Sequence, residues 1–248
     1  MSHRPSRAAL VLVLAACLET AVARAADYPW VMLAPANDSR DADEVAHDDQ
    51  QSLSMVAVIN QDEELLHQSL VWRKVMIKDL LAMQVPFCEM HFDAVNPVGL
   101  TPEEKGILAE YLKRGGFILF FIDAYPYPEE EFWKIKEWPV IDFLTRELPA
   151  SDPGFTIRKA TDDFPLFKVH YKTETADAIR HELTGNPNTP NRTLVYYKSR
   201  LCCFVMGSYS YLEDGTWQAA DRPFSTDFSM ELKSYQLIVN VYIYAITD

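Results

Sequence analysis

The sequence contains little glycine, only 8 residues in 248, which argues against a glycine-rich loop that cradles a phosphate group. Cysteine is also scarce, since 4 residues in a chain of this length do not make a disulfide scaffold. Basic residues are outnumbered, with 23 Lys and Arg against 36 Asp and Glu and a formal net charge of −13. Nucleic acids and anionic lipids attract basic surfaces, so we expect this protein to bind neither by charge.

A long hydrophobic run is missing as well. A helix needs about 20 apolar residues to span a bilayer. The most apolar later segment, 228–247, is interrupted by Glu231, Lys233 and Asn240, so we expect no transmembrane span. What is present is the composition of a packed globular protein, with 48% hydrophobic and 24% charged residues, which excludes disorder.

The N-terminus has the three-part layout of a secretory signal. Arg4 and Arg7 make a basic start, residues 8–18 are apolar and uncharged, and alanines then complete a cleavage motif. Residues 1–25 are therefore predicted to be a signal peptide. Residues 27–248 are predicted to be a single domain outside the cytoplasm, periplasmic or secreted.

A second interpretation within the export class rests on Cys17. Residues 14–17, Leu-Ala-Ala-Cys, are similar to the lipobox of bacterial lipoproteins. In those proteins the preceding residues, 1–16 here, are removed and the cysteine is lipidated. Contact with a membrane is then expected only through a lipid at Cys17. Both interpretations predict export.

The clearest local pattern is a capped helix at 102–114. Thr101 can accept a hydrogen bond from the Glu104 backbone while the Glu104 side chain reaches back, and Pro102 suits the first helical position. After Gly115 and Gly116, residues 117–122 are six apolar residues without alternation, which indicates a strand covered on both faces. With a further strand at 85–90, this order predicts an α/β fold with a parallel sheet.

Apolar patterns and their breaks predict the remaining segments. Strands are expected at 27–36, 155–159, 193–197 and 201–207, and a strand or edge element is expected at 53–60. A polar surface loop is expected at 37–51, and helices are expected at 62–72, 130–148 (broken near Pro139) and 228–247. For the last segment a strand is the alternative, because it is rich in Val, Ile and Tyr.

Four pieces in order resemble the domain-of-unknown-function family 4159. They are VPFCEM with LTPEEKGILAEYLKRGGFILFFIDAY, then FPLFKVHY at 164–171, RLCCFVMGSYSYLEDGTW at 200–217, and SYQLIVNVYIYAITD at the end. Together they cover most of residues 85–248, whereas 37–80 match poorly. Asp163 stands where the family often has His.

The resemblance implies a fold similar to class I glutamine amidotransferases: a flavodoxin-like α/β sandwich with a mainly parallel central sheet and some added short antiparallel strands. It implies no reaction. In the amidotransferase-like fold, the nucleophile lies on a tight turn directly after a strand, following the logic of the nucleophile elbow. Here Asp123, Ala124 and Tyr125 follow the strand, without Cys, Ser or Gly. Amidotransferase activity is therefore not expected.

Three ionisable residues are predicted to gather at one edge of the sheet. Asp123 ends one strand, and His91 and Asp93 follow the neighbouring strand candidate. Ligands of open α/β sheets bind outside the carboxyl ends of the strands. These side chains can hold a divalent cation or act as a general acid and base. The alternative is local capping and solvation.

Tyr125 lies in an aromatic-rich stretch just past Asp123, and we take Asp123, Tyr125 and Asp93 as candidate ligand-binding residues. Loop packing is the alternative for the tyrosine. Cys88, Cys202 and Cys203 lie in apolar stretches and are expected to be buried small hydrophobic residues. A bridge from Cys88 to one of the adjacent pair is the alternative.

These observations favour a non-catalytic domain of the bacterial cell envelope that binds an envelope protein or a small ligand, without a resident cofactor. The alternative is a hydrolase or metal-dependent enzyme that uses Asp123, His91 and Asp93 with a divalent metal.

Overall fold

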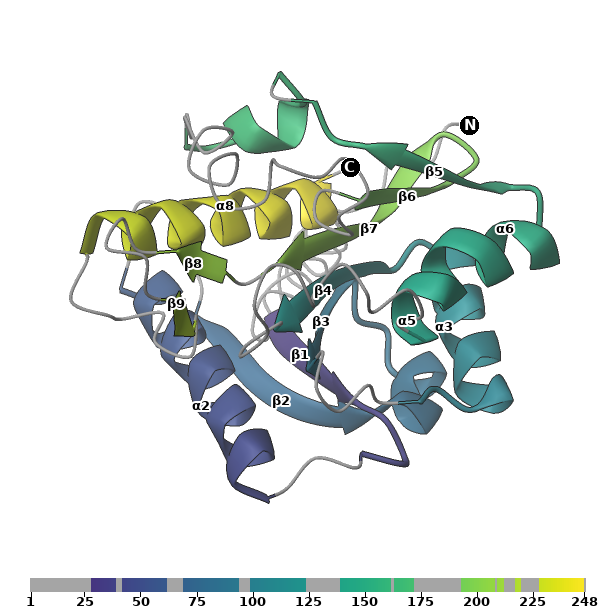
Figure 1. Ribbon diagram of the computed structural model, residues 1–248, viewed down its shortest axis with the longest axis horizontal. Coiled ribbons are helices and arrows are strands. Elements are labelled where there is room, and N and C mark those ends of the chain that lie inside the picture. The colour runs from purple at the N-terminus through teal and green to yellow at the C-terminus, as the bar shows by residue number, and fades with distance from the viewer. Residues whose placement is uncertain are drawn as a thin grey trace, which may run out of the picture.

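A computed structural model describes residues 28–38, 42–61, 69–93, 99–123, 139–161, 163–171, 193–207, 209–211, 217–219 and 228–247. They form an α/β fold in which helices pack on both faces of a seven-stranded mixed sheet, mostly parallel (Figure 1). The predicted fold class is confirmed. The signal segment, with Cys17, lies outside the described residues.

The sheet has the strand order β2-β1-β3-β4-β7-β6-β5. The strands are β1 (Tyr28–Ala34), β2 (Leu70–Met76), β3 (Phe87–Asp93), β4 (Phe117–Asp123), β5 (Phe155–Lys159), β6 (Thr193–Tyr197) and β7 (Arg200–Gly207). The first five in this order are parallel to one another. At one edge, β6 pairs antiparallel with β7, and β5 pairs antiparallel with β6. The parallel part therefore has the flavodoxin-like order, in which the chain runs outward from β1 in both directions. A separate pair joins β8 (Tyr209–Tyr211) to β9 (Trp217–Ala219).

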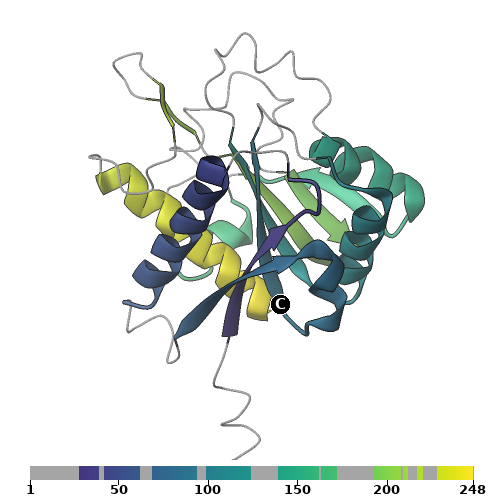
Figure 2. The ribbon, with the colours of Figure 1, turned by 90° about the horizontal axis from the view of Figure 1, so that it is seen from below.

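The helices form two layers. The α-helices are α2 (Ala42–Ile59), α3 (Pro102–Lys113), α5 (Pro139–Asp142), α6 (Leu148–Ser151) and α8 (Phe228–Thr247). Two 3-10 helices are η1 (Ile77–Ala82) and η3 (Pro165–Lys168), and a π-helical turn is η2 (Phe143–Glu147). Figure 2 shows α2 and α8 on one face of the sheet and α3 with α5 and α6 on the other. None of the described helices is long and apolar enough to cross a bilayer.

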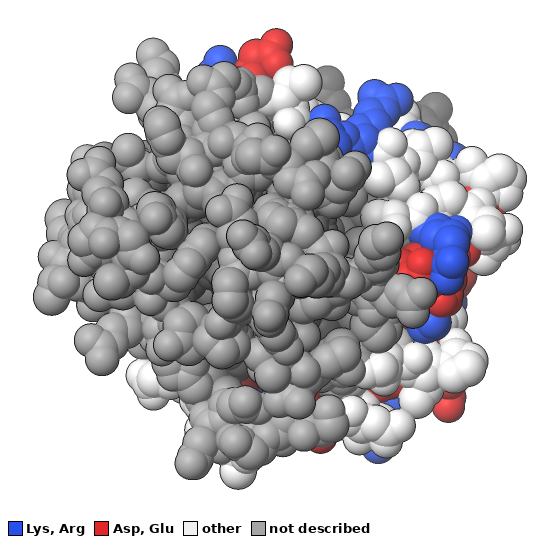
Figure 3. All heavy atoms as spheres, in the orientation of Figure 1, with Lys and Arg blue, Asp and Glu red and all other residues white. Residues whose placement is uncertain are grey.

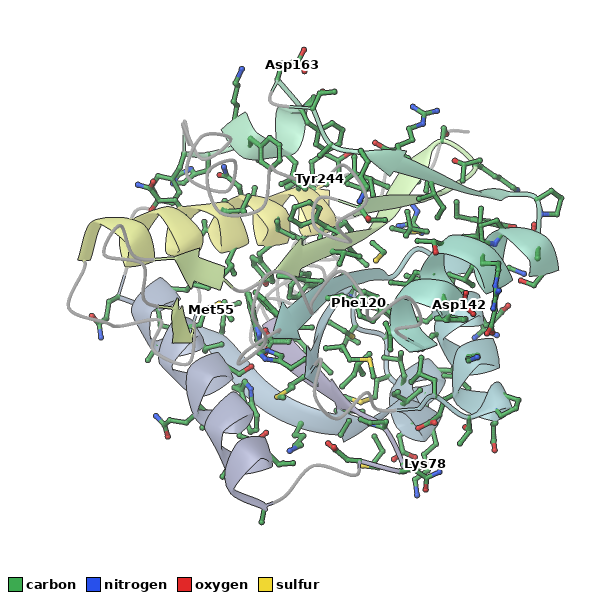
Figure 4. All side chains as sticks on the ribbon, viewed as in Figure 1. Met55, Lys78, Phe120, Asp142, Asp163 and Tyr244 are labelled. Carbon is green, nitrogen blue, oxygen red and sulfur yellow. The ribbon has the colours of Figure 1, made fainter. Side chains whose placement is uncertain are left out.

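Each face of the sheet has its own apolar core, because alternate residues of a strand point to opposite faces. On β4, Phe120 packs toward α3, while its neighbour Leu119 packs toward α2 and α8. Met55 of α2 belongs to the second core and the partly buried Tyr244 of α8 packs against it; both are labelled in Figure 4. The doubly buried strand predicted at 117–122 is thus confirmed.

Helix α3 is capped as the sequence predicts. The Thr101 side chain accepts from the Glu104 backbone N–H at 3.2 Å, and the Glu104 carboxylate accepts from the Thr101 N–H at 2.9 Å. Gly115 follows with φ 108°, a left-handed conformation that glycine adopts without strain. A Cβ at Gly116 would collide with the Tyr111 ring, so this glycine lets β4 approach the helix.

The prediction for residues 37–60 is wrong. The expected loop at 37–51 and strand at 53–60 are mostly one helix, α2. Its inner face is a buried stripe at helical spacing, formed by Ser52, Met55, Val56 and Ile59. Burial of this stripe on the sheet outweighs the β-propensity of the Val-rich segment, which misled the prediction.

The helix predicted at 62–72 is also wrong where it can be compared. Residues 70–72 begin the strand β2, and 62–68 lie outside the described residues. Leu70 and Trp72 face the sheet's second core, so the apolar spacing that suggested a helix belongs to an alternating strand.

The other expected strands, and the closing helix, are confirmed as β1, β3, β5, β6, β7 and α8. Of the segment 130–148, the structure describes the part from Pro139, which is helical as expected. Cys88, Cys202 and Cys203 are buried and free, which confirms their prediction as small core residues and contradicts the alternative of a bridge.

Candidate functional site

The strand order defines where a ligand site is expected. From β1 the chain crosses to β2 through α2, and from β3 it crosses to β4 through α3, so the two helices leave from opposite faces. In flavodoxin-like sheets this divergence opens a crevice at the carboxyl ends of β1 and β3, and ligands bind there. The two sides of that position are built differently in this protein.

The α3 side is closed by Glu104. Its Oε1 accepts a 2.6 Å hydrogen bond from the backbone N–H of Ala36, just past the end of β1. Its Oε2 accepts from the backbone N–H of Thr101 at 2.9 Å and from the Thr101 hydroxyl at 2.8 Å. Both carboxylate oxygens are therefore used to join the loop after β1 to the start of α3, and Glu104 is 3% exposed.

The α2 side holds a buried polar group that we call the Glu89 cluster, made of Ser52, Glu89 and His91. Ser52 and Glu89 are fully buried, and His91 is 9% exposed. The Ser52 hydroxyl donates a hydrogen bond to Glu89 Oε1. Glu89 Oε2 lies 3.7 Å from His91 Nε2 and accepts no hydrogen bond from any described residue. Among the described residues, one oxygen of a fully buried carboxylate thus has no hydrogen-bond donor.

Alternation along β3 produces this cluster. Phe87, Glu89 and His91 are two residues apart, so they share the face covered by α2 and α8. Phe87 packs in the apolar core there, and the His91 ring lies 4.8 Å from that of Phe121 on β4. The face is thus apolar at the amino end of the strands and polar toward the carboxyl end.

Helix α2 matches this gradient. It runs past the sheet with Ile59 and Met55 on the apolar core and Ser52 on Glu89. One turn further toward its start, Asp49 forms an ion pair with Lys74 of β2, in which the Lys74 ammonium donates to Asp49 Oδ1 at 2.7 Å and both side chains are 28% exposed. The Asp49–Lys74 pair lies at the edge of the covered face, while the carboxylate of Glu89 stays inside it.

Of the residues predicted from sequence, the structure places His91 in the cluster. Asp93 and Asp123 are direct partners in the β3–β4 register, so their backbones lie side by side at the carboxyl edge. Their side chains lie outside the described residues, and so does Tyr125. Among the described side chains, no three His, Cys, Asp or Glu gather as a metal site.

Sequence reasoning missed Glu89 and Ser52. Glu89 had a visible signal, since it is a charged residue inside an apolar strand segment, and buried charges need partners. Ser52 had none, because its segment was assigned to no helix and its contact with β3 joins residues 37 positions apart.

The cluster does not have the geometry of a catalytic triad. In a triad the serine hydroxyl is bonded to the imidazole, whereas the Ser52 hydroxyl is bonded to the carboxylate. The described cysteines lie in the core on the other face, toward α3. Burial raises the pKa of Cys88 to about 12, despite a 3.3 Å hydrogen bond to the Tyr111 hydroxyl. Burial also raises the pKa of Cys202 to about 12, so neither thiol is an activated nucleophile.

The described surface around α3, α5 and α6 mixes both signs of charge. Ion pairs join Lys105 to Glu147 and Lys113 to Asp152, each at 2.7 Å. Figure 3 shows basic and acidic side chains next to one another on this part of the molecule.

Fold and site together define an α/β protein of flavodoxin-like strand order with a buried carboxylate–imidazole pair near the carboxyl ends of its strands. No family model matches the chain, and no curated protein matches it. The resemblance to the family of unknown function stays a prediction based on the four quoted segments.

Proposed function

We propose that this protein is an exported, non-catalytic domain of the bacterial cell envelope that binds a small polar ligand or a partner's polar group. The binding site is the carboxyl edge of β3 and β4 on the α2 side. Glu89 and His91 form its floor, and Asp93 and Asp123 stand at its rim.

One observation carries this proposal: Glu89 Oε2 is fully buried and lacks a hydrogen-bond donor among the described residues. An unsatisfied buried carboxylate oxygen costs at least about 1–3 kcal/mol. A protein that keeps it there gains when a ligand supplies the donor. Glu104, the other buried glutamate among the described residues, accepts hydrogen bonds on both oxygens, so among these two the missing donor is on the α2 side.

The lack of an amidotransferase-type nucleophile in the sequence after β4 favours binding over catalysis. Residues 123–125, Asp-Ala-Tyr, contain no Cys, Ser or Gly, and the described thiols lie in the opposite core. The N-terminal pattern supports export, and an acidic protein of this kind would be free, tethered through Cys17, or held by a partner.

The test of binding is a screen of small polar ligands by thermal shift, followed by two-dimensional NMR on the full exported chain. We expect hits to perturb the amides of Asp93 and Asp123 and to lose affinity in Asp123→Asn. Hits that perturb only the α3 face would overturn the proposed site. Mass spectrometry of the mature N-terminus tests export, because an uncleaved Met1 would contradict it.

A metal-dependent hydrolase that uses His91, Asp93 and Asp123 is the second candidate. The observation that favours it is the Asp93–Asp123 register pair, two residues beyond His91 on neighbouring strands. Turnover of an ester or phosphoester substrate that is lost in both Asp123→Asn and His91→Gln would establish this candidate over the binding domain.

A further inference from the structure

We infer that the Glu89 cluster binds a divalent transition-metal ion, with Glu89 Oε2 and His91 Nε2 as two of its ligands. This inference rests on the proposed function in placing the ligand site at this edge, and it names the chemistry of what binds there.

The separation of the two atoms fits a shared ion. Glu89 Oε2 and His91 Nε2 are 3.7 Å apart, which is longer than the roughly 2.7–3.2 Å of a direct hydrogen bond. Carboxylate oxygens and imidazole nitrogens lie about 2.0–2.2 Å from zinc. Two ligands at such distances and 3.7 Å apart subtend about 120° at the metal, close to a tetrahedral or trigonal arrangement.

The surroundings hold the carboxylate as a metal site requires. The Ser52 hydroxyl fixes Glu89 Oε1 and leaves Oε2 turned to the imidazole. Such a hydrogen bond to a ligating carboxylate orients the ligand and is a regular feature of metal sites. The His91 ring is set by its packing on Phe121. An ion pair alone would be a costly use of a buried carboxylate.

Two acidic residues follow the cluster at the carboxyl edge of the sheet. Asp93 lies two residues beyond His91 along β3, and Asp123 is the register partner of Asp93 on β4. Each lies about 7 Å of strand beyond the His91 level. Water completes the coordination where no side chain does. Imidazole and carboxylate are both ligands that zinc takes in proteins.

The experiment uses the full exported chain, freed of metal by a chelator and then titrated calorimetrically with zinc chloride. We expect one equivalent to bind. Loss of even an outer-shell partner lowers metal affinity about 10- to 100-fold, so Glu89→Gln and His91→Gln should each weaken binding by at least about 100-fold. Ser52→Ala should weaken it about 10-fold.

Glu104→Gln is the matched control, because it changes a buried glutamate on the opposite face and should keep the full affinity. A second measurement uses the wild-type chain loaded with cobalt and therefore does not depend on how the variants fold. Its visible absorption and extended X-ray absorption fine structure should show at least one imidazole ligand. Three results would overturn the inference. They are a wild type that does not bind zinc, a cobalt spectrum without an imidazole ligand, and equal zinc affinity in the wild type and Glu89→Gln. If polar ligands bind the metal-free protein at Asp93 and Asp123, that result would still support the proposed function.

Discussion

Two buried glutamates of the described chain have opposite surroundings. Glu104 accepts three hydrogen bonds from Ala36 and Thr101, so both oxygens of its carboxylate are stabilised by donors of the protein. Glu89 accepts one, from Ser52, and keeps an oxygen for a further partner. The same side chain therefore serves as a structural cap in one place and as a candidate ligand in the other.

Glu104→Ala should destabilise the protein by about 2–4 kcal/mol. The change removes a shared set of charge-assisted hydrogen bonds, whose contributions do not add, and leaves the Ala36 N–H without its acceptor. Urea unfolding followed by circular dichroism measures it. Glu103→Ala, one residue away and exposed, should change the free energy of unfolding by no more than about 0.5 kcal/mol. Equal losses in the two variants would contradict the assigned role.

The buried cysteines should be inert in the folded protein. Burial raises the pKa of Cys88 and of Cys202 to about 12 and that of Cys203 well above its usual value, so almost no thiolate exists at pH 8. Iodoacetamide at that pH should leave all three unmodified, while the same treatment in guanidinium should modify each one. Peptide mass spectrometry reads the result, and modification of the native Cys88 would contradict the described core.

At the scale of elements, Arg200 joins the β6–β7 hairpin to the end of α3. Its guanidinium donates to the carbonyl oxygens of Leu112, Gly115 (3.1 Å) and Gly116 (3.3 Å). These carbonyls lie at the negative end of the helix, where a cation is favourable. One side chain thus fixes the turn that leads from α3 into β4.

Arg200→Ala should cost about 1.5–3 kcal/mol of stability, since charged donors to several carbonyls are lost. Arg200→Lys should recover only part of it, because an ammonium lacks the planar fork. Arg114→Ala is the control: its pair with Glu110 is exposed and worth at most about 0.5 kcal/mol. Chemical denaturation of the three variants measures these changes in the free energy of unfolding. A loss of stability in Arg114→Ala as large as in Arg200→Ala would contradict the role assigned to Arg200.

The Lys113–Asp152 pair ties α3 to the segment before β5 and makes stability depend on pH. The hydrogen bond from Lys113 lowers the pKa of Asp152 below 3.8, and the same bond raises the pKa of Lys113 above 10.5. The stabilisation by Asp152 is therefore present above pH 3.8 and is lost as the pH falls through its folded pKa. The stabilisation by Lys113 is present below pH 10.5 and is lost as the pH rises through its folded pKa.

Asp152→Asn should flatten the acid limb of the stability curve and also the alkaline limb that Lys113 contributes. Lys113→Met should do the same, and the double variant should add nothing further, since both changes remove one interaction. Unfolding free energies across the pH range test this. Additive effects in the double variant would show that the two side chains act independently.

At the scale of the whole molecule, the sequence predicted the strand–helix–strand unit around α3 because its signals are local: a capping box, a glycine turn and a doubly buried strand. The prediction for the α2 segment was wrong because this helix is stabilised by burial against β1, β2 and β3 rather than by its own helix propensity. The strand order that joins five parallel strands was beyond any local pattern.

The candidate site divides in the same way. His91 was found because it follows an apolar run close to the carboxyl end of β3, where open sheets bind ligands. Glu89 and Ser52 were missed because their meeting depends on where α2 packs, and the two residues are 37 positions apart in the chain.

Asn240 of α8 makes a structural contact that was equally hidden from local patterns. Its side-chain oxygen accepts from the backbone N–H groups of His170 (3.0 Å) and Tyr171 (2.9 Å), and its Nδ2 donates to the Tyr171 carbonyl at 2.9 Å. This fully buried amide fixes the 164–171 segment to the helix, and these hydrogen bonds join residues about 70 positions apart.

The central claim is that the buried carboxylate on the α2 side of the sheet is kept for a bound cation. A crystal of the full exported chain grown with zinc and measured across the zinc absorption edge tests it most directly. We predict one anomalous peak within about 2.0–2.2 Å of both Glu89 Oε2 and His91 Nε2. No peak there, with the two side chains closed into a direct hydrogen bond of about 2.8 Å, would contradict the account.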